Sequence, residues 1–221
     1  MSGETKADVR HEIQYSQNMT KPAARGRARV ACVLLAAGGS TRLGQPKQLV
    51  RRRLKPLLLH ALDAARDVPI ADEDIVVVLG AAALRLRALL RRHSPAVRVA
   101  PNPRWATGLA SSLRAGLAAA PRGASAALVQ LVDQPNVDAA ALRRLLAAWR
   151  RRPSAPAAAH YSGRAGVPAI LPRRDWRQAR ALDGDAGARA LLRNADAITL
   201  VAMPEAVFDV DTPADLARLY G

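Results

Sequence analysis

The sequence is poor in cysteine and in aromatic side chains. Cys32 is the one cysteine among 221 residues, so neither an intramolecular disulfide nor a cysteine-based metal cluster can form. It lies in the apolar run VACVLLAA, which predicts an inert core residue rather than a nucleophile. Aromatic residues make up 3% of the chain, which disfavours binding of single-stranded nucleic acid by base stacking.

Long apolar runs are also missing. No stretch of 18 or more uncharged apolar residues occurs, and the polar residues 1–29 lack the apolar segment of a secretory signal. We therefore expect a cytoplasmic protein that does not associate with a membrane.

Basic residues are abundant, but few of them are lysines. The formal net charge is +16, with 34 lysines and arginines, of which four are lysines. The arginines are spread over segments of helical periodicity such as LRLRALLRR and ALRRLLAAWRRR. This distribution is typical of solvated helix faces and argues against a nucleic-acid partner, although such a charge can steer anionic substrates or an acidic partner enzyme towards the protein.

The order of apolar segments indicates one α/β domain. Residues 1–28 mix charges, glycine, proline and asparagine without periodicity, which predicts a disordered tail before a single domain at 29–221. Short apolar runs then alternate with longer amphipathic ones, as in βαβ units around a mostly parallel sheet. The segment RRPSAP is the best internal boundary, between a nucleotide-binding half at 29–150 and an acceptor-binding half at 151–221.

Periodicity predicts individual elements within this domain. The expected strands are 30–36, 75–79, 97–100, 126–132, 156–161, 167–171, 198–202 and 206–210. The expected helices are 56–66, 81–92, 108–120, 138–151, 186–193 and 213–219.

A glycine-rich loop follows the first predicted strand. The stretch LLAAGGSTRLGQPKQL places glycines where the backbone can turn tightly and expose its N–H groups to an anion. Arg42 and Lys47 add charged donors. The loop ends without the Gly-Lys-Ser/Thr of a Walker motif, and the chain has no G-x-G-x-x-G. The candidate phosphate-binding residues here are Ala37, Gly38, Gly39, Ser40 and Gly44.

This loop resembles the signature loop of nucleotidyltransferases, L-A-A/G-G-x-S/G-x-R-x-G-x-x-K. Four further stretches resemble blocks of the molybdenum cofactor cytidylyltransferase group within the MobA-like NTP transferase family: NPRWATGLASSLRAGL, LVQLVDQP, LDGDAGARALL and FDVDTPADLARL. The resemblance covers residues 31 to 219 and implies a three-layer α/β/α, Rossmann-like nucleotidyltransferase fold. Val167 stands where the group commonly has histidine, which leaves the identity of the acceptor open.

The resemblance implies a reaction and a set of ligands. A phosphorylated acceptor, molybdopterin cofactor, would attack the α-phosphorus of CTP and release pyrophosphate, with Mg²⁺ or Mn²⁺ as cofactor and Arg42 and Lys47 neutralising charge. The loop sequence AAG, in place of AGG, favours CTP over GTP. The product would pass to a molybdoenzyme or a maturation factor. A sugar phosphate or another phosphorylated acceptor, and a cofactor chaperone without catalysis, remain alternatives.

Three aspartates are candidate metal ligands. Asp133 follows a buried strand, where ligands bind in open α/β sheets, although it could instead cap the next helix unless Asn136 or Asp138 does so. Asp209 and Asp211 would point to one side of the predicted strand 206–210. We favour Asp209 as the second ligand, because Asp211 could cap the last helix.

Two helix starts offer further candidate residues. Gly108 permits a close backbone approach, and Ser111 and Ser112 could bind base or ribose or could serve only as a helix cap. Asp185 and Arg189 of the GDAGAR segment could bind the anionic group of the second substrate or form a surface salt bridge.

Overall fold

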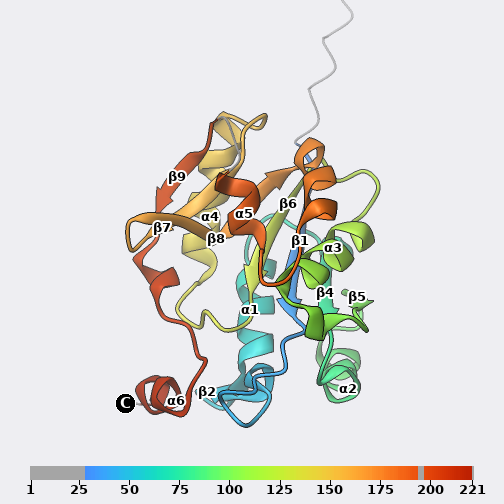
Figure 1. The fold of residues 1–221 in the computed structure, drawn as a ribbon, viewed down its shortest axis with the longest axis vertical. Helices are drawn as coiled ribbons and strands as arrows, with labels where there is room; N and C mark the ends of the chain where they lie inside the picture. The colour runs from blue at the N-terminus through green and yellow to red at the C-terminus, as the bar shows by residue number, and fades with distance from the viewer. Residues whose placement is uncertain (1–27, 194–196, 221) are drawn as a thin grey trace, which may run out of the picture.

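A seven-stranded sheet organises the chain in the computed structural model, which describes residues 28–193 and 197–220 (Figure 1). The predicted tail at 1–28 lies outside these residues except for its last position. The strands are β1 (Val30–Ala36), β2 (Arg51–Arg52), β3 (Lys55–Pro56), β4 (Ile75–Leu79), β5 (Arg98–Pro101), β6 (Ala126–Leu131), β7 (Ala157–Tyr161), β8 (Arg164–Pro172) and β9 (Thr199–Ala202). The α-helices are α1 (Leu57–Arg66), α2 (Ala83–His93), α3 (Leu109–Ala119), α4 (Ala139–Arg151), α5 (Ala188–Arg193) and α6 (Pro213–Tyr220).

The sheet is mostly parallel, as predicted. Its strand order is β5-β4-β1-β6-β8-β7-β9, and β8 alone runs antiparallel to its two neighbours. Strands β7 and β8 form a hairpin whose two-residue loop, Ser162-Gly163, has φ of 49° and 73°. Positive φ at both positions matches the twist of the flanking strands. Strands β2 and β3 form a separate small hairpin that the sequence analysis did not predict.

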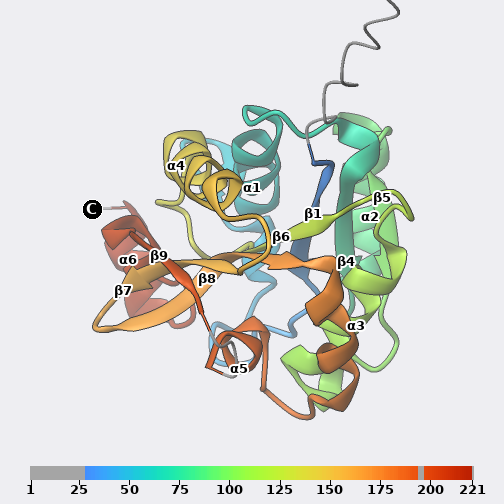
Figure 2. The same cartoon turned by 90° about the horizontal axis from the view of Figure 1, so that it is seen from above.

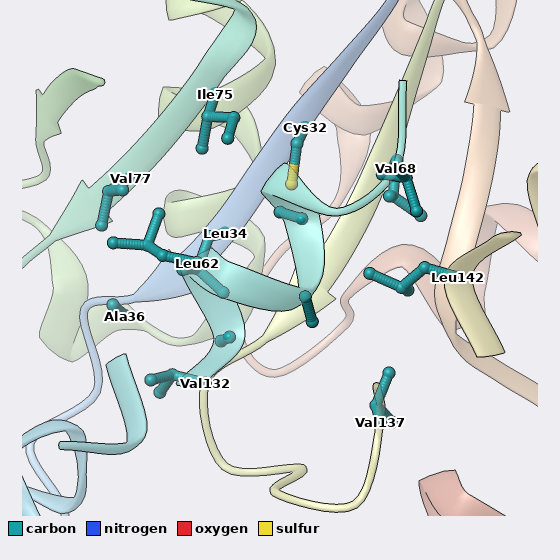
Figure 3. Close-up of a cluster of buried hydrophobic side chains, with 14 of the residues drawn as sticks. Cys32, Leu34, Ala36, Leu62, Val68, Ile75, Val77, Val132, Val137 and Leu142 are labelled. Carbon is teal, nitrogen blue, oxygen red and sulfur yellow. The ribbon is translucent and has the colours of Figure 1, made fainter. Parts of the chain in front are cut away.

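Helices cover both faces of the sheet, which confirms the three-layer fold. Figure 2 shows α1 and α4 on one side and α3 and α5 on the other, and the buried side chains of α2 pack in the same cluster as those of α1 and α4. Alternate residues of β1 point to opposite layers, so Cys32 and Leu34 pack with α1 and α4 while Val33 packs against α3. Figure 3 shows part of the core on the α1 and α4 side of the sheet, where Leu62 and Leu142 are labelled.

Cys32 is a core residue, as expected. Its side chain is fully buried, and this burial raises the pKa of the thiol to about 12. The reactive thiolate is therefore scarce near neutral pH, and Cys32 serves packing only.

The prediction of a strand at 206–210 was wrong. The segment Pro204–Val207 forms a short 3-10 helix, η5, and residues 208–211 have no regular structure. Pro204 has no N–H to donate to a neighbouring strand, and the Val207 side chain is 53% exposed. The sequence analysis predicted no helix or strand at Arg173–Ala181, where the structure has a nine-residue 3-10 helix, η4.

Within the described ranges, no helix combines the length and the apolar character needed to cross a membrane.

Candidate functional site

The glycine-rich loop leaves the carboxyl end of β1 and is fixed by buried hydrogen bonds. The fully buried Gln48 donates from Nε2 to the carbonyl oxygens of Ala36 and Gly38, at 2.9 and 3.0 Å. The N–H groups of Leu43 and Gly44 both donate to the Ser40 carbonyl, and φ of 74° at Gly44 closes this turn. These hydrogen bonds therefore fix the conformation of the loop. Sequence reasoning missed Gln48, although it lies beside Lys47 in the motif.

Lys47 connects two carboxylates from distant parts of the chain. Its Nζ donates to Asp133 Oδ2 at 2.5 Å and to Asp211 Oδ1 at 2.8 Å, and its side chain is only 14% exposed. Burial alone lowers the pKa of Lys47, but the charges and hydrogen bonds of the two aspartates outweigh it and raise the pKa overall. Lys47 therefore remains an ammonium ion at neutral pH.

Arg42 extends this ionic network to the surface. Its NH2 donates to Asp211 Oδ2 at 3.0 Å, while its side chain is 70% exposed. An exposed pair of this kind stabilises the fold little, because water screens it. The guanidinium is thus available at the mouth of the site.

Asp133 and Asp211 are not used as helix caps. Asp138 caps α4, since its Oδ1 accepts from the Ala141 N–H at 2.8 Å. At α6, Thr212 and Asp215 cap each other's backbone: the Thr212 N–H donates to the Asp215 carboxylate at 2.9 Å, and the Asp215 N–H donates to Thr212 Oγ1 at 3.2 Å. Both aspartates are therefore free for the site.

The geometry places Asp211, and not the preferred Asp209, beside Lys47 in the cleft. Asp211 lines the cleft and Asp209 does not, because the backbone at 208–211 is irregular and does not alternate as a strand would. Burial, together with repulsion from Asp133 and Asp211, raises the pKa of Asp209 to about 6. One oxygen of Asp209 and one of Asp133 are buried without a hydrogen-bond partner.

The three aspartates do not form a ready-made metal cage. Among the residues that the structure describes, no three histidine, cysteine, aspartate or glutamate side chains lie close enough together to hold one ion. The Lys47 ammonium lies between Asp133 and Asp211 instead.

The start of α3 packs against the GDAGAR segment. The Ala110 N–H donates to the Gly184 carbonyl at 3.0 Å, and Gly108 has φ of 105°. A Cβ on Gly108 would lie 2.2 Å from the carbonyl carbon and oxygen of Gly184, so only glycine permits this approach. Asp185, the next residue, lines the cleft.

The serines of α3 have different surroundings. Both are buried and accept hydrogen bonds from Asn102 Nδ2, at 2.9 Å for Ser111 and 3.0 Å for Ser112. The Ser111 hydroxyl also lies 2.9 Å from the carbonyl oxygens of Arg104 and Gly108, and Ser111 does not line the cleft. Ser112 does. Ser111 thus supports the helix start rather than facing a ligand.

These segments enclose a cleft of about 620 Å³ at the carboxyl ends of β1 and β6. The predicted residues that line it are Ala37, Gly38, Gly39, Ser40, Arg42, Lys47, Gly108, Ser112, Asp133, Asp185 and Asp211. Those that do not line it are Gly44, Ser111, Arg189 and Asp209. Arg189 has a buried Nε without a hydrogen-bond partner and lies away from the cleft lining.

Trp105 forms a wall that the site prediction did not include. The structure places its ring directly over the loop: a Cβ on Gly39 would lie 2.8 Å from the ring, and one on Gly80 would lie 2.6 Å from the tryptophan Cβ. The two glycines thus make room for the indole. Its position in the block NPRWATGLASSL was the available signal, since that block contains the start of α3.

Comparisons with known proteins agree with this geometry. The sequence model of the MobA-like NTP transferase domain matches residues 32–199. Nicotine blue oxidoreductase from Paenarthrobacter nicotinovorans is 38% identical over 175 residues, which cover 74% of this chain and 81% of that protein.

Solved structures with the same fold include Rv0371c from Mycobacterium tuberculosis H37Rv. It is 31% identical, with a TM-score of 0.75, and the match covers 87% of this chain and 98% of that one. A structure of Rv0371c in complex with manganese matches with 28% identity and a TM-score of 0.71, over 87% and 98% of the two chains.

Proposed function

Since the chain belongs to the family of MobA-like NTP transferase domains, and is thus a nucleotidyltransferase, we propose that it transfers CMP from CTP to the terminal phosphate of molybdopterin cofactor. Family membership confirms the coarser part of the resemblance that the motifs indicated, to the MobA-like NTP transferase family. The choice of CTP and of molybdopterin goes further and is our proposal. It is supported by the combined motifs of the loop, the GDAGAR segment and the closing DVDTP.

The observation that carries the proposal is the convergence of Lys47, Asp133 and Asp211 in the cleft beside the glycine-rich loop. The loop offers backbone N–H groups, Lys47 is a buried cation, and the two carboxylates belong to segments far apart in sequence. This combination suits a triphosphate, because phosphoryl chemistry depends on positioning and on neutralising charge.

The proposed reaction needs no general base. An oxygen of the acceptor phosphate forms a bond to the α-phosphorus of CTP, the bond from that phosphorus to the bridging oxygen breaks, and pyrophosphate leaves with the bonding electrons. The second pKa of a phosphate monoester is about 6, so the attacking oxygen is already ionised near neutral pH. Among the described residues that line the cleft, neither histidine nor cysteine occurs.

The charges in the cleft fit a divalent cation. Its lining carries two cationic side chains, Arg42 and Lys47, and three carboxylates, including Asp133 and Asp211, so it cannot alone balance a triphosphate. The unpartnered oxygen of Asp133 is suited to a hard cation. We propose that Asp133 and Asp211 would hold Mg²⁺ or Mn²⁺, and the manganese complex of Rv0371c supports this choice. When bound, such a cation neutralises phosphate charge.

The residues of the chain supply the remaining steps. The N–H groups of the glycine-rich loop would bind the β- and γ-phosphates, and Lys47 would stabilise charge that develops at the α-phosphorus. Arg42 would reach the phosphates from the cleft mouth. Ser112 would contact the nucleoside, and Asp185 would lie on the side of the acceptor.

The proposed division of labour follows the chain. Residues 29–150 would bind the nucleotide and residues 151–221 the acceptor, although Asp211 joins the nucleotide site from the second half. We also propose that the protein acts in the cytoplasm and delivers its product to a molybdoenzyme or a maturation factor. Val167 packs in the core next to α3 and α5, so it offers the acceptor no polar group.

The test is an assay of pyrophosphate release with Mg²⁺ and freshly released molybdenum cofactor, with CTP, GTP, ATP and UTP supplied separately. Turnover with CTP alone, reduced about 100-fold or more in Lys47→Ala, is the expected result. Lys55→Ala is the matched control, because Lys55 forms only a surface pair with Asp63 and its side chain is 45% exposed. Turnover with another nucleotide, or only with a sugar phosphate as acceptor, would correct the substrate. No turnover with any pair would contradict the proposal.

Oxidoreductase chemistry is the second candidate, because the relative from P. nicotinovorans is named for it at 38% identity. The absence of G-x-G-x-x-G and the ionic network around Lys47 favour nucleotidyl transfer instead. Following oxidation of NADH and NADPH in the same preparations distinguishes the two.

A further inference from the structure

A second cavity, which we call the arginine groove, lies between α3 and the 3-10 helix η4 and has a volume of about 870 Å³. Figures 1 and 2 both show the orange coil of η4 beside α3. The groove is lined by Arg114, Leu117, Ala118, Arg173, Arg174, Trp176, Arg177, Ala179 and Arg180. Five of these nine residues are arginines, and none is acidic. None of the residues assigned to the proposed transfer reaction lines this groove.

The helix η4 is firmly attached through one of its faces. Arg173 donates to the Ala124 carbonyl at 3.2 Å and lies over the Trp176 ring, 4.8 Å from its centroid. Trp176 Nε1 donates to the Leu171 carbonyl at 3.0 Å, and Ala179 is buried. Because a 3-10 helix repeats every three residues, Arg173, Trp176 and Ala179 form this inner face.

The same period places three arginines in a row on another face. Arg174, Arg177 and Arg180 are spaced three residues apart and are all exposed, so they form a ladder with steps of about 6 Å along the helix axis. Arg174 has one weak ion pair, with Asp175 at 3.4 Å. Arg177 and Arg180 form no ion pair with any carboxylate in the part of the chain that the structure describes.

We propose that the arginine groove is a docking site for an acidic, extended segment of a partner protein. Carboxylates at every second position of an extended chain point to one side and are spaced about 6.6–6.8 Å apart, which matches the arginine ladder. Each guanidinium can pair with a carboxylate through two parallel hydrogen bonds. Repulsion among five nearby arginines further favours an anionic occupant.

The groove is less suited to other occupants. Single-stranded nucleic acid binds through aromatic platforms, but the face of Trp176, the one aromatic residue in the lining, is covered by Arg173. Residues 1–27 of the chain carry five basic and three acidic side chains and so lack the required charge. A second copy of a chain with a net charge of +16 would be repelled.

The experiment measures binding of a fluorescent peptide by anisotropy at about 0.15 M salt, where only charges within about 8 Å interact strongly. The probe is an alternating Glu-Ser peptide of twelve residues. One control peptide has glutamine for glutamate, and another, about sixteen residues long, places the same number of glutamates three residues apart. The expected result is binding of the alternating peptide at least about tenfold tighter than of either control.

Two charge-matched variants assign the binding to the groove. Arg174→Gln/Arg177→Gln/Arg180→Gln should weaken binding at least about tenfold. The variant Arg85→Gln/Arg87→Gln/Arg91→Gln removes three exposed charges from α2 and should leave binding within about twofold. If the first triple variant does not fold, as judged by circular dichroism, Arg177→Gln alone should give about a threefold loss.

Other outcomes overturn the proposal. Equal losses in both triple variants would show attraction by the overall charge only. Tighter binding of a single-stranded dT12 that is lost in the η4 variant would assign the groove to nucleic acid. No binding of the alternating peptide would exclude an acidic segment. None of these results depends on pyrophosphate release, so failure here is separate from failure of the proposed function.

Discussion

Replacing Gly108 with alanine should disrupt the contact between α3 and the GDAGAR segment. Gly108 has φ of 105° and ψ of 178°, a conformation that essentially only glycine adopts. This strain would cost about 1–3 kcal/mol. The new methyl group would also lie 2.2 Å from backbone atoms of Gly184, which cannot rotate away. Such overpacking typically costs a further 1–3 kcal/mol or so. We expect the free energy of unfolding to fall by about 3–4 kcal/mol in total.

Urea denaturation of two alanine variants separates strain from contact. Gly163→Ala is the matched control, because Gly163 has φ of 73° but its Cβ would meet nothing within 4 Å. This variant should lose only about 1 kcal/mol. The Gly108 variant should also raise the KM for the acceptor, since Asp185 follows the displaced Gly184, while the KM for CTP should change less.

Equal destabilisation by the two substitutions would refute this reasoning. It would mean that the contact between Gly108 and Gly184 contributes nothing and that positive φ alone requires the glycine. An increase in the KM for CTP alone would likewise contradict the assignment of Asp185 to the acceptor side.

Three further substitutions test separate parts of the site. Asp209→Asn should stabilise the protein in the presence of a chelator. The pKa of the Asp209 carboxyl is about 6 in the folded protein, against an ordinary 3.8, so the folded protein loses stability as the pH rises through this range and the carboxyl ionises. The full shift corresponds to about 3 kcal/mol, which partial exposure reduces to about 1–2 kcal/mol; urea denaturation should show this gain at pH 8 and none near pH 3.5. Thr212→Ala should remove a capping interaction of α6 and lower the free energy of unfolding by about 1 kcal/mol in the same assay. Trp105→Ala should leave Gly39 uncovered and weaken CTP binding about tenfold, as measured by calorimetry.

The buried elements were predictable because their environment is uniform. β4 was predicted with its observed bounds, since a strand covered on both faces is a continuous apolar run. The segment EAVFDV has a similar apolar pattern, but it follows the edge strand β9 and has only one neighbour to pair with. Pro204 and the exposed Val207 then favour a short 3-10 helix. Composition does not encode the position of a strand in the sheet, so the pattern alone could not exclude this strand.

The site was predictable where a motif is local and not where it depends on packing. The loop and Lys47 stand next to each other in sequence, and their arrangement follows from the turn at Gly44. The choice between Asp209 and Asp211 depends on the irregular backbone after η5, which no local pattern specifies. Trp105 reaches the cleft only because Gly39 and Gly80 lack side chains.

Helix α3 connects the cleft with the arginine groove. Its first turn lines the cleft through Leu109 and Ser112, and its second half lines the groove through Arg114 and Leu117. Arg114 also donates to the Leu182 carbonyl, at the start of the segment that carries Asp185 into the cleft. A partner segment in the groove would therefore lie against the same helix and the same loop that line the cleft. The proposed docking site and the proposed acceptor side thus share α3 and the loop at Leu182, so a partner bound in the groove would lie next to the end of the cleft that carries Asp185.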